Sequence, residues 1–151
     1  MRLERFRWWH IDDALRIEEE LFGVERWTAA MFWNELANGH CYLAALDETD
    51  VLVGYAGLAV LRDEAWVQNI AVRRDLQRHG IGRALLEALL AEATRRGVRK
   101  VLLEVAVDNA SAQKLYGMYD FEPIGVRRGY YQPSNTDALV MQRLMEVGRE
   151  G

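Results

Sequence analysis

The alternation of apolar and polar residues divides this chain into short segments of two kinds. Runs that are rich in branched and aromatic side chains and bounded by turn residues predict β-strands. They lie at residues 3–7, 40–46, 51–61, 64–72, 100–105, 124–128 and 138–143. Apolar residues spaced three and four apart predict helices, at residues 11–22, 28–37, 82–96 and 109–119.

Turn and cap residues support these boundaries. Gly23 and Gly97 follow the first and third helical segments, where a helix end favours a left-handed backbone. Thr28 is a good N-cap for the second helix. Residues 47–50 form a turn between two strands, and Pro133, Ser134 and Asn135 form another between the last two. Helices therefore interleave with strands, which predicts an α/β (α+β) fold.

Composition and charge narrow the class of protein. At 151 residues, half of them hydrophobic and 28% charged, the chain is expected to form one globular domain. No apolar run approaches the roughly 18 residues of a membrane span. The N-terminus has no apolar signal core, so we expect a cytoplasmic protein without a membrane partner. The net charge of −4 argues against a nucleic-acid-binding protein, which would carry a basic patch.

The sequence gives no sign of a metal site. The single cysteine, Cys41, excludes an internal disulfide and a site made only of cysteines. The three histidines, His10, His40 and His79, lack the spacing of metal ligands. We therefore expect no metal.

Residues 77–83, Gln-Arg-His-Gly-Ile-Gly-Arg, connect an apolar run to an amphipathic one, in the order strand, glycine loop, helix. A helix N-terminus has unpaired N–H groups and partial positive charge, and glycines let a phosphate approach them. The P-loop motif is missing, and so is the third glycine of a dinucleotide fingerprint. By itself the segment is either a cradle for a phosphorylated cofactor or a tight turn before a surface helix.

The spacing Gln-x-x-Gly-x-Gly after a strand resembles the acetyl-CoA pyrophosphate loop of the GCN5-related N-acetyltransferase (GNAT) family. A second block, residues 103–116 (LEVAVDNASAQKLY), is similar to a segment of that family with Glu, Asn and Tyr at the same spacing. Residues 127–131, Arg-Arg-Gly-Tyr-Tyr, resemble the branch that acetylates the N-terminal alanine of ribosomal protein S18. Two positions depart from the pattern. Asp120 stands where the family has a glycine, and Asp tolerates the left-handed backbone expected there. Arg26 stands in place of a proline before Trp27.

The resemblance implies a single-domain GNAT fold over residues 1–151, with its core from about residue 3 to 144: a mixed, mostly antiparallel twisted sheet flanked by helices. It also implies acetyl-CoA as cosubstrate. The implied cofactor-binding residues are Ile70, Ala71 and Val72 on a strand, Arg78, His79, Gly80, Ile81, Gly82 and Arg83 around the pyrophosphate, and Asn109. Five of them have a structural alternative: Ile70 and Val72 suit a core, Arg78 and Arg83 a solvated surface, and Asn109 a plain N-cap.

Two residues match the family's catalytic groups. Glu104, a carboxylate in an apolar strand, matches the base that takes the proton of the attacking amine; alternatively it faces solvent. Tyr116 matches the acid that protonates the leaving thiolate, since a phenol with a pKa near 10 and a thiol with one near 8.5 can exchange a proton. Its alternative is a core tyrosine. Because Cys41 lies outside both blocks, we expect direct attack in a ternary complex.

Aromatic residues are the candidates for contacts with the acceptor. Tyr130 and Tyr131, expected in a loop beside the last hairpin, could wall a peptide groove with Trp27 opposite, or could only pack. Trp8, Trp9, Trp33 and Trp66 are expected to pack. The predicted partner is a protein N-terminus, that of ribosomal protein S18. The rival functions are acetylation of a lysine or a small amine, and a CoA-binding module without catalysis.

Overall fold

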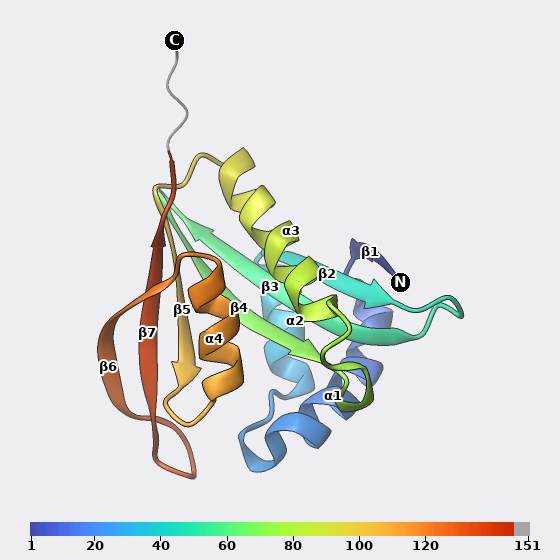
Figure 1. Ribbon diagram of the computed structural model, residues 1–151. Helices are drawn as coiled ribbons and strands as arrows, with labels where there is room; N and C mark the ends of the chain where they lie inside the picture. Colours follow the sequence, from blue (N-terminus) through green and yellow to red (C-terminus); the bar gives the residue numbers. More distant parts are fainter. Residues whose placement is uncertain (147–151) are drawn as a thin grey trace. The chain divides into compact units, whose positions relative to one another are not determined.

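The computed structural model describes residues 1–146 of the chain (Figure 1). Contacts divide it into two compact units, each built from two stretches of sequence. The first unit joins Met1–Ala59 to Gln68–Leu89, and the second joins Val60–Val67 to the chain from Leu90 on. The expectation of one domain over residues 1–151 therefore stays a prediction.

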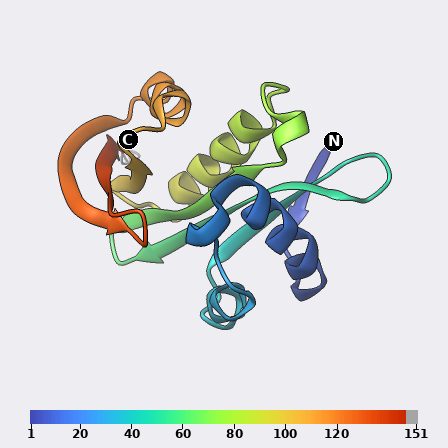
Figure 2. The same cartoon turned by 90° about the horizontal axis from the view of Figure 1, so that it is seen from below.

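The first unit pairs three strands in antiparallel order: β1 (Arg2–Arg5), β2 (Cys41–Leu46) and β3 (Leu52–Leu61). The helices are α1 (Ile11–Phe22), α2 (Ala29–Ala37) and the first turns of α3 (Ile81–Arg95). Short 3-10 turns precede them at Trp8–His10 (η1), Gly23–Glu25 (η2) and Arg74–Leu76 (η3). Figure 2 shows α1 and α2 on one face of these strands and α3 on the other.

Aromatic rings fill the core of the first unit. Phe6 stacks on Phe32 with their ring centroids 5.8 Å apart, and it meets Tyr42 and Tyr55 edge-on at 5.9 and 6.1 Å. All four side chains are almost completely buried. Edge-to-face and offset contacts of this kind add to the free energy gained by removing the rings from water. Because the rings come from β1's end, α2, β2 and β3, they fix those elements together.

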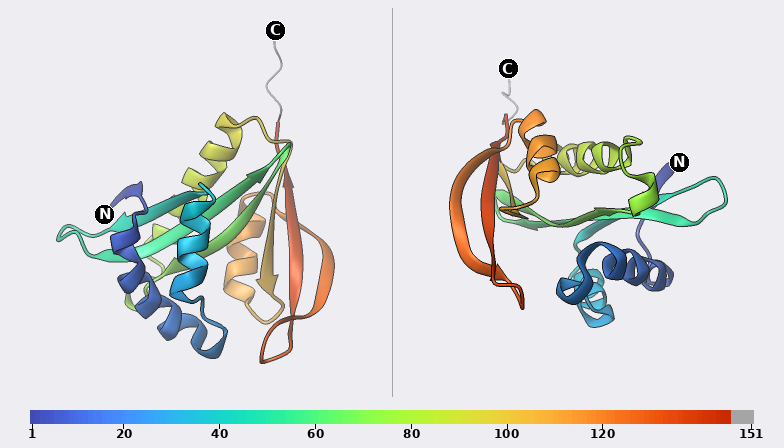
Figure 3. Two further views of the ribbon diagram at one scale, coloured as in Figure 1. Left: turned by 180° about the vertical axis from the view of Figure 1, so that it is seen from behind. Right: turned by 60° about the horizontal axis from the view of Figure 1, so that its bottom comes forward.

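The second unit is built on β5 (Lys100–Ala106), which pairs in parallel with the start of β4 (Glu64–Val72) over Glu64–Trp66. On its other side β5 pairs antiparallel with β7 (Thr136–Leu144). β7 also pairs antiparallel with β6 (Glu122–Tyr131), which curves beside it in Figure 3. The helices of this unit are the end of α3, from Leu90 on, and α4 (Ala110–Met118), between β5 and β6. The hydrogen-bonded strands follow the order β1-β2-β3-β4-β5-β7-β6, which confirms the predicted mixed, mostly antiparallel sheet.

Some boundaries differ from the sequence-based expectation. The last hairpin is confirmed, but β6 extends to Tyr131, so Tyr130 and Tyr131 lie at the end of a strand and not in a loop. Helix α3 begins at Ile81, one residue before the expected start. Asp120 has a φ of 66°, which confirms the left-handed geometry expected at that position.

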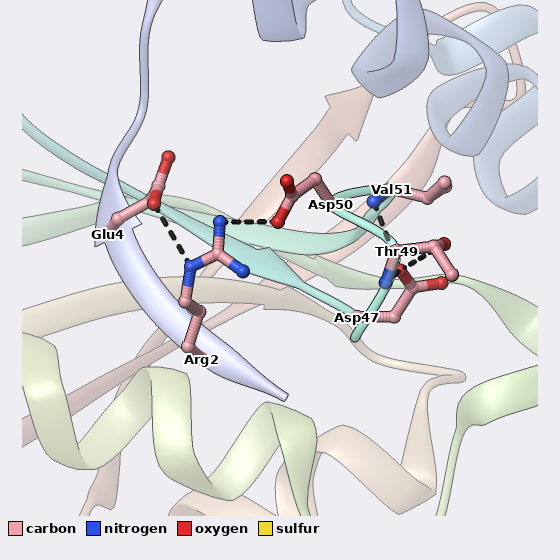
Figure 4. Close-up of polar contacts among 6 residues, drawn as sticks. All are labelled: Arg2, Glu4, Asp47, Thr49, Asp50 and Val51. Carbon is pink, nitrogen blue, oxygen red and sulfur yellow. Dashed lines mark hydrogen bonds and ion pairs between the residues drawn. The ribbon is translucent and has the colours of Figure 1, made fainter.

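The predicted turn at residues 47–50 is held by one carboxylate. Oδ1 of Asp47 accepts hydrogen bonds from the backbone N–H and hydroxyl of Thr49, both at 2.8 Å, and from the N–H of Val51 at 3.0 Å (Figure 4). These bonds lower the pKa of Asp47. Arg2 reaches Asp50 at 2.6 Å and so ties β1 to the turn. An aspartate that bonds the backbone two residues on is the usual chemistry of such a turn.

One glycine is required by packing. Gly57 on β3 lies opposite Tyr42 on β2, and a Cβ at position 57 would overlap the Tyr42 ring. The Tyr42 hydroxyl donates to Oε1 of Glu35 at 2.8 Å, so the ring is held at both ends.

Gly57→Ala should therefore destabilise the protein by about 1–3 kcal/mol, the usual cost of overpacking a tight core. The control is Gly117→Ala on α4, where a Cβ meets nothing within 4 Å. Because alanine favours helix, this variant should gain up to about 1 kcal/mol. Chemical denaturation measures both, and equal stability of the two variants would contradict the packing assigned to Gly57.

Candidate active site

The predicted glycine loop is an exposed segment that leads into a long helix. After η3 the loop runs through Arg78, with a φ of 68°, and Gly80, with a φ of 82°, before α3 begins. The side-chain amide of Gln77 donates to the carbonyl of Val72 at 3.1 Å and so holds the loop to the end of β4. A Cβ at Gly80 would meet nothing within 4 Å. The loop thus presents the N-terminus of a 15-residue helix beside open space, as anion binding requires.

The other residues predicted for the cofactor lie close by in sequence. Arg78 and Arg83 are exposed and form no ion pair within residues 1–146, so both guanidinium groups are available. Ala71 is buried, while Ile70 and Val72 are half-buried at the end of β4. The ladder from β4 to β5 stops at Trp66, so Ile70–Val72 lie beyond its end. Backbone groups beyond a ladder can pair with an extended ligand.

Asn109 lies in the second unit and is the N-cap of α4. Its Oδ1 accepts the N–H of Ala112 at 3.2 Å. The structural alternative for Asn109 is thus confirmed, and its cofactor contact stays a prediction.

Glu104 occupies an inward position of β5, with 12% of its side chain exposed. Oε1 lies 3.3 Å from the guanidinium of Arg127. Oε2 is buried and accepts no hydrogen bond from any residue between 1 and 146. The solvent-facing alternative for Glu104 is therefore wrong. A buried carboxylate oxygen without a donor is costly, and it is a ready acceptor for an N–H group.

Arg127 was not predicted as part of the site, and neither was Trp66. The guanidinium carbon of Arg127 lies 5.8 Å from the Trp66 ring centre and 5.7 Å from that of Tyr130. Two aromatic faces and one carboxylate thus hold a single cation. The sequence carried a weak signal for Arg127, its place in the Arg-Arg-Gly-Tyr-Tyr run, but none for Trp66.

Tyr130 and Tyr131 lie beside the pair formed by Glu104 and Arg127. Their rings meet edge-on at 5.0 Å, and the Tyr131 hydroxyl lies 3.4 Å from the Glu104 carbonyl oxygen. Burial, and then the Glu104 carboxylate, raise the pKa of Tyr130. Tyr131 also contributes to the raised pKa of Tyr116.

Tyr116 is 5% exposed and packs edge-on against Phe121 with 5.9 Å between ring centres. Burial is the main cause that raises its pKa. The hydroxyl therefore stays protonated throughout the physiological pH range, as a proton donor must before it acts. Its core position fits the structural alternative as well, and the acid role stays a prediction.

The tryptophans fall into three groups. Trp27, in the first unit, is half-buried and packs on Phe32 with 5.3 Å between ring centres. Trp66 packs beneath Arg127. The others pack as expected, but at the surface: Trp8, Trp9 and Trp33 are 60%, 57% and 51% exposed. They stack on one another at the surface, which a sequence pattern cannot distinguish from core packing.

Within residues 1–146 no group of three or more His, Cys, Asp or Glu side chains is placed to hold a metal ion. In the same range no helix has both the length and the apolar character to cross a membrane.

Comparison with known proteins identifies the family. The model of the acetyltransferase (GNAT) family matches residues 3–121. The chain is 41% identical over 132 residues to the N-alpha-acetyltransferase RimI of Mycobacterium tuberculosis, covering 84% of this chain and 82% of that one. It is 38% identical over 127 residues to the ribosomal protein bS18-alanine N-acetyltransferase of Escherichia coli K12, covering 80% and 86%.

Solved structures agree with the sequence comparisons. The crystal structure of the ribosomal-protein-S18-alanine N-acetyltransferase from Escherichia coli superposes with a TM-score of 0.89 at 30% identity, covering 99% of this chain and 97% of that one. The family predicted from the two sequence blocks is thereby confirmed. The chain belongs to the acetyltransferase (GNAT) family, whose members transfer an acetyl group from acetyl-CoA to an amine.

Proposed function

We propose that this enzyme acetylates the N-terminal amine of a protein, the N-terminal alanine of ribosomal protein S18, by direct attack of that amine on acetyl-CoA. The relatives named above as S18-alanine N-acetyltransferases support the acceptor. We place the reaction in the cytoplasm, where acetyl-CoA and newly made ribosomal proteins meet.

The observation that carries the chemistry is the buried Oε2 of Glu104, which has no hydrogen-bond partner among residues 1–146. An amine attacks a thioester only as the neutral base, so its proton needs an acceptor. Oε2 offers a lone pair inside an otherwise apolar strand, while Arg127 neutralises the other oxygen. The incoming ammonium would satisfy Oε2, so substrate binding and proton removal would use the same atom.

One carboxylate is enough for an α-amine but serves a lysine less well. A peptide α-amine has a pKa of about 7.7–8.0, so part of it is neutral near pH 7, whereas a lysine amine titrates near 10.4. The difference corresponds to about 3 kcal/mol in the free energy of deprotonation. A single base without a metal therefore suits an N-terminal amine.

For the cofactor we propose that the pyrophosphate of acetyl-CoA lies on the N–H groups of residues 80–83, with Arg78, His79 and Arg83 around it. The backbone of Ile70, Ala71 and Val72 would pair with the pantetheine arm, and Asn109 would add a contact beside its cap. The positive end of the α3 dipole suits the charge of the phosphates, and so do the guanidinium groups of Arg78 and Arg83, which form no ion pair within residues 1–146.

Tyr116 is proposed to give its proton to the leaving thiolate. Because burial raises the pKa of its phenol, Tyr116 is a weaker acid than a free tyrosine. We therefore expect Tyr116 to lower the activation barrier only modestly, because a thiolate is a fair leaving group even without a proton. Tyr130, Tyr131 and Trp27 are proposed to line the peptide.

The acceptor is tested by product mass spectrometry on two peptides. One carries the S18 N-terminus with a free α-amine and no lysine, and the other has a blocked α-amine and one lysine. We expect acetylation of the first to be faster at pH 7, because more of its amine is neutral. Faster acetylation of the lysine peptide would overturn the N-terminal assignment.

Glu104→Gln should reduce the rate on the alanine peptide by roughly 10²-fold near pH 7, the low end for loss of a general base. Above the pKa of the α-amine the defect should shrink, because free neutral amine partly replaces the base. Rates measured from pH 6.5 to about 9.5 test this. Glu4→Gln is the control, since Glu4 lies on β1 and pairs with Arg2. A rate equal to wild type at every pH would remove the base role.

Tyr116→Phe should keep the buried ring and its contact with Phe121 while slowing turnover by about 10²-fold or less, again the low end for acid catalysis. Affinity for CoA, measured by calorimetry, should not change. The matched variant is Tyr119→Phe, at the C-cap that follows the same helix, which should retain full activity. If Tyr116→Phe turned over as fast as wild type, Tyr116 would be a core residue only.

A further inference from the structure

Glu18 is a buried carboxylate that the proposed acetyl transfer does not use. It lies on α1, and 1% of its surface is exposed. Oε1 accepts the backbone N–H of Trp27 at 2.7 Å. Oε2 accepts the hydroxyl of Tyr55 and, at 3.4 Å, the side-chain amide of Asn69. One side chain of the first unit thus joins four segments: α1, the segment before α2, β3 and β4.

Packing does not account for a carboxylate at this position. A buried carboxylate loses its hydration, and apolar side chains of similar volume often replace such a group without loss of stability. Burial raises the pKa of Glu18, and its three hydrogen-bond donors act in the opposite direction. A carboxylate at this position therefore costs free energy of folding. We attribute its presence to the segments that its hydrogen bonds hold in place.

The segment that Glu18 holds has no regular structure of its own. Residues 26–28 connect η2 to α2. At one end the N–H of Arg26 bonds to the Gly23 carbonyl at 3.2 Å, and at the other Thr28 caps α2 by accepting the N–H of Met31 at 3.3 Å. Between these two anchors the N–H of Trp27 is bonded to Glu18. The position of the Trp27 backbone thus depends on that carboxylate.

The same carboxylate also touches the strand proposed for the cofactor. Asn69, which donates to Oε2, directly precedes Ile70 on β4. Tyr55, the other donor to Oε2, lies on β3 and is completely buried in the aromatic core. Through Glu18, the backbone of Trp27 is therefore linked to two strands, β3 and β4, and not only to helix α1.

We propose that Glu18 is a positioning residue for the acceptor: it fixes the backbone at Trp27 and thereby the side of the peptide groove that Trp27 lines. The role toward the peptide rests on the proposed function. The anchoring of the 26–28 segment does not.

Glu35 supplies a matched control. It is also a buried carboxylate of the first unit, 6% exposed, and lies on α2. Its partners are the Tyr42 hydroxyl at 2.8 Å and Nε2 of His40 at 3.5 Å. Neither partner belongs to the 26–28 segment, so loss of Glu35 removes a similar buried group without freeing Trp27.

Steady-state kinetics with the alanine peptide and acetyl-CoA test the proposal. Glu18→Met keeps the volume and removes both acceptors, so KM for the peptide should rise about tenfold or more, the effect of losing one charge-assisted hydrogen bond. KM for acetyl-CoA should rise less than KM for the peptide, because only the long Asn69 hydrogen bond links Glu18 to the strand proposed for the cofactor. The value of kcat should not change. Glu18→Gln should restore most of the peptide KM, because its amide oxygen can accept the Trp27 N–H. Glu35→Met should lose stability and keep the peptide KM.

An unchanged peptide KM in folded Glu18→Met, or an equal rise in Glu35→Met, would overturn the proposal. Amide hydrogen exchange of the wild-type protein gives a second readout that needs neither a variant nor acetyl transfer. The Trp27 amide should exchange far more slowly than that of Val24, which is 73% exposed in η2. Equal exchange at the two positions would overturn the anchoring. A protected Trp27 amide in a protein that leaves the alanine peptide unmodified would overturn the proposed acceptor and uphold the anchoring.

Discussion

A carboxylate that is taken out of water needs hydrogen-bond donors, and this requirement governs the arrangement of both units. Burial of an unpaired carboxylate costs several kcal/mol even after relaxation. In the first unit Glu18 and Glu35 are buried and each receives donors from other elements. In the second unit Glu104 receives Arg127 on Oε1, and its Oε2 has no donor among residues 1–146. The two satisfied carboxylates hold structure together, and the unsatisfied one is the candidate for chemistry.

The surroundings of Glu104 show how the sheet prepares such a group. β5 places it between apolar neighbours, and β6 brings Arg127 to one of its oxygens. The guanidinium group lies against Trp66 and Tyr130, whose ring faces attract a cation and limit its movement. Arg127 can therefore neutralise the carboxylate on one side while the other oxygen stays available. The ion pair, the aromatic contacts and an oxygen without a donor among residues 1–146 thus meet around the proposed base.

Much of this architecture could be predicted because it is local. Thr28 and Asn109 cap their helices, Asp120 adopts the left-handed backbone and residues 47–50 form a turn, since each depends on chemistry within a few residues. The glycine loop is equally local: Gln77, Gly80 and the start of α3 lie within five residues. Predicted element boundaries were wrong where tertiary pairing decides them. In β6, pairing with β7 extends the strand through Tyr131.

The sequence by itself determined the order of helices and strands, the glycine loop and the two blocks that identify the family, because these are read from spacing along one chain. Only the tertiary structure decided which carboxylates are satisfied. The partners of Glu18 are Trp27, Tyr55 and Asn69, up to 51 residues away along the chain, and Arg127 approaches Glu104 from another strand. Tertiary structure likewise placed Trp8, Trp9 and Trp33 at the surface. Burial and hydrogen bonding depend on which segments meet in space, and residue spacing along the chain does not specify those meetings.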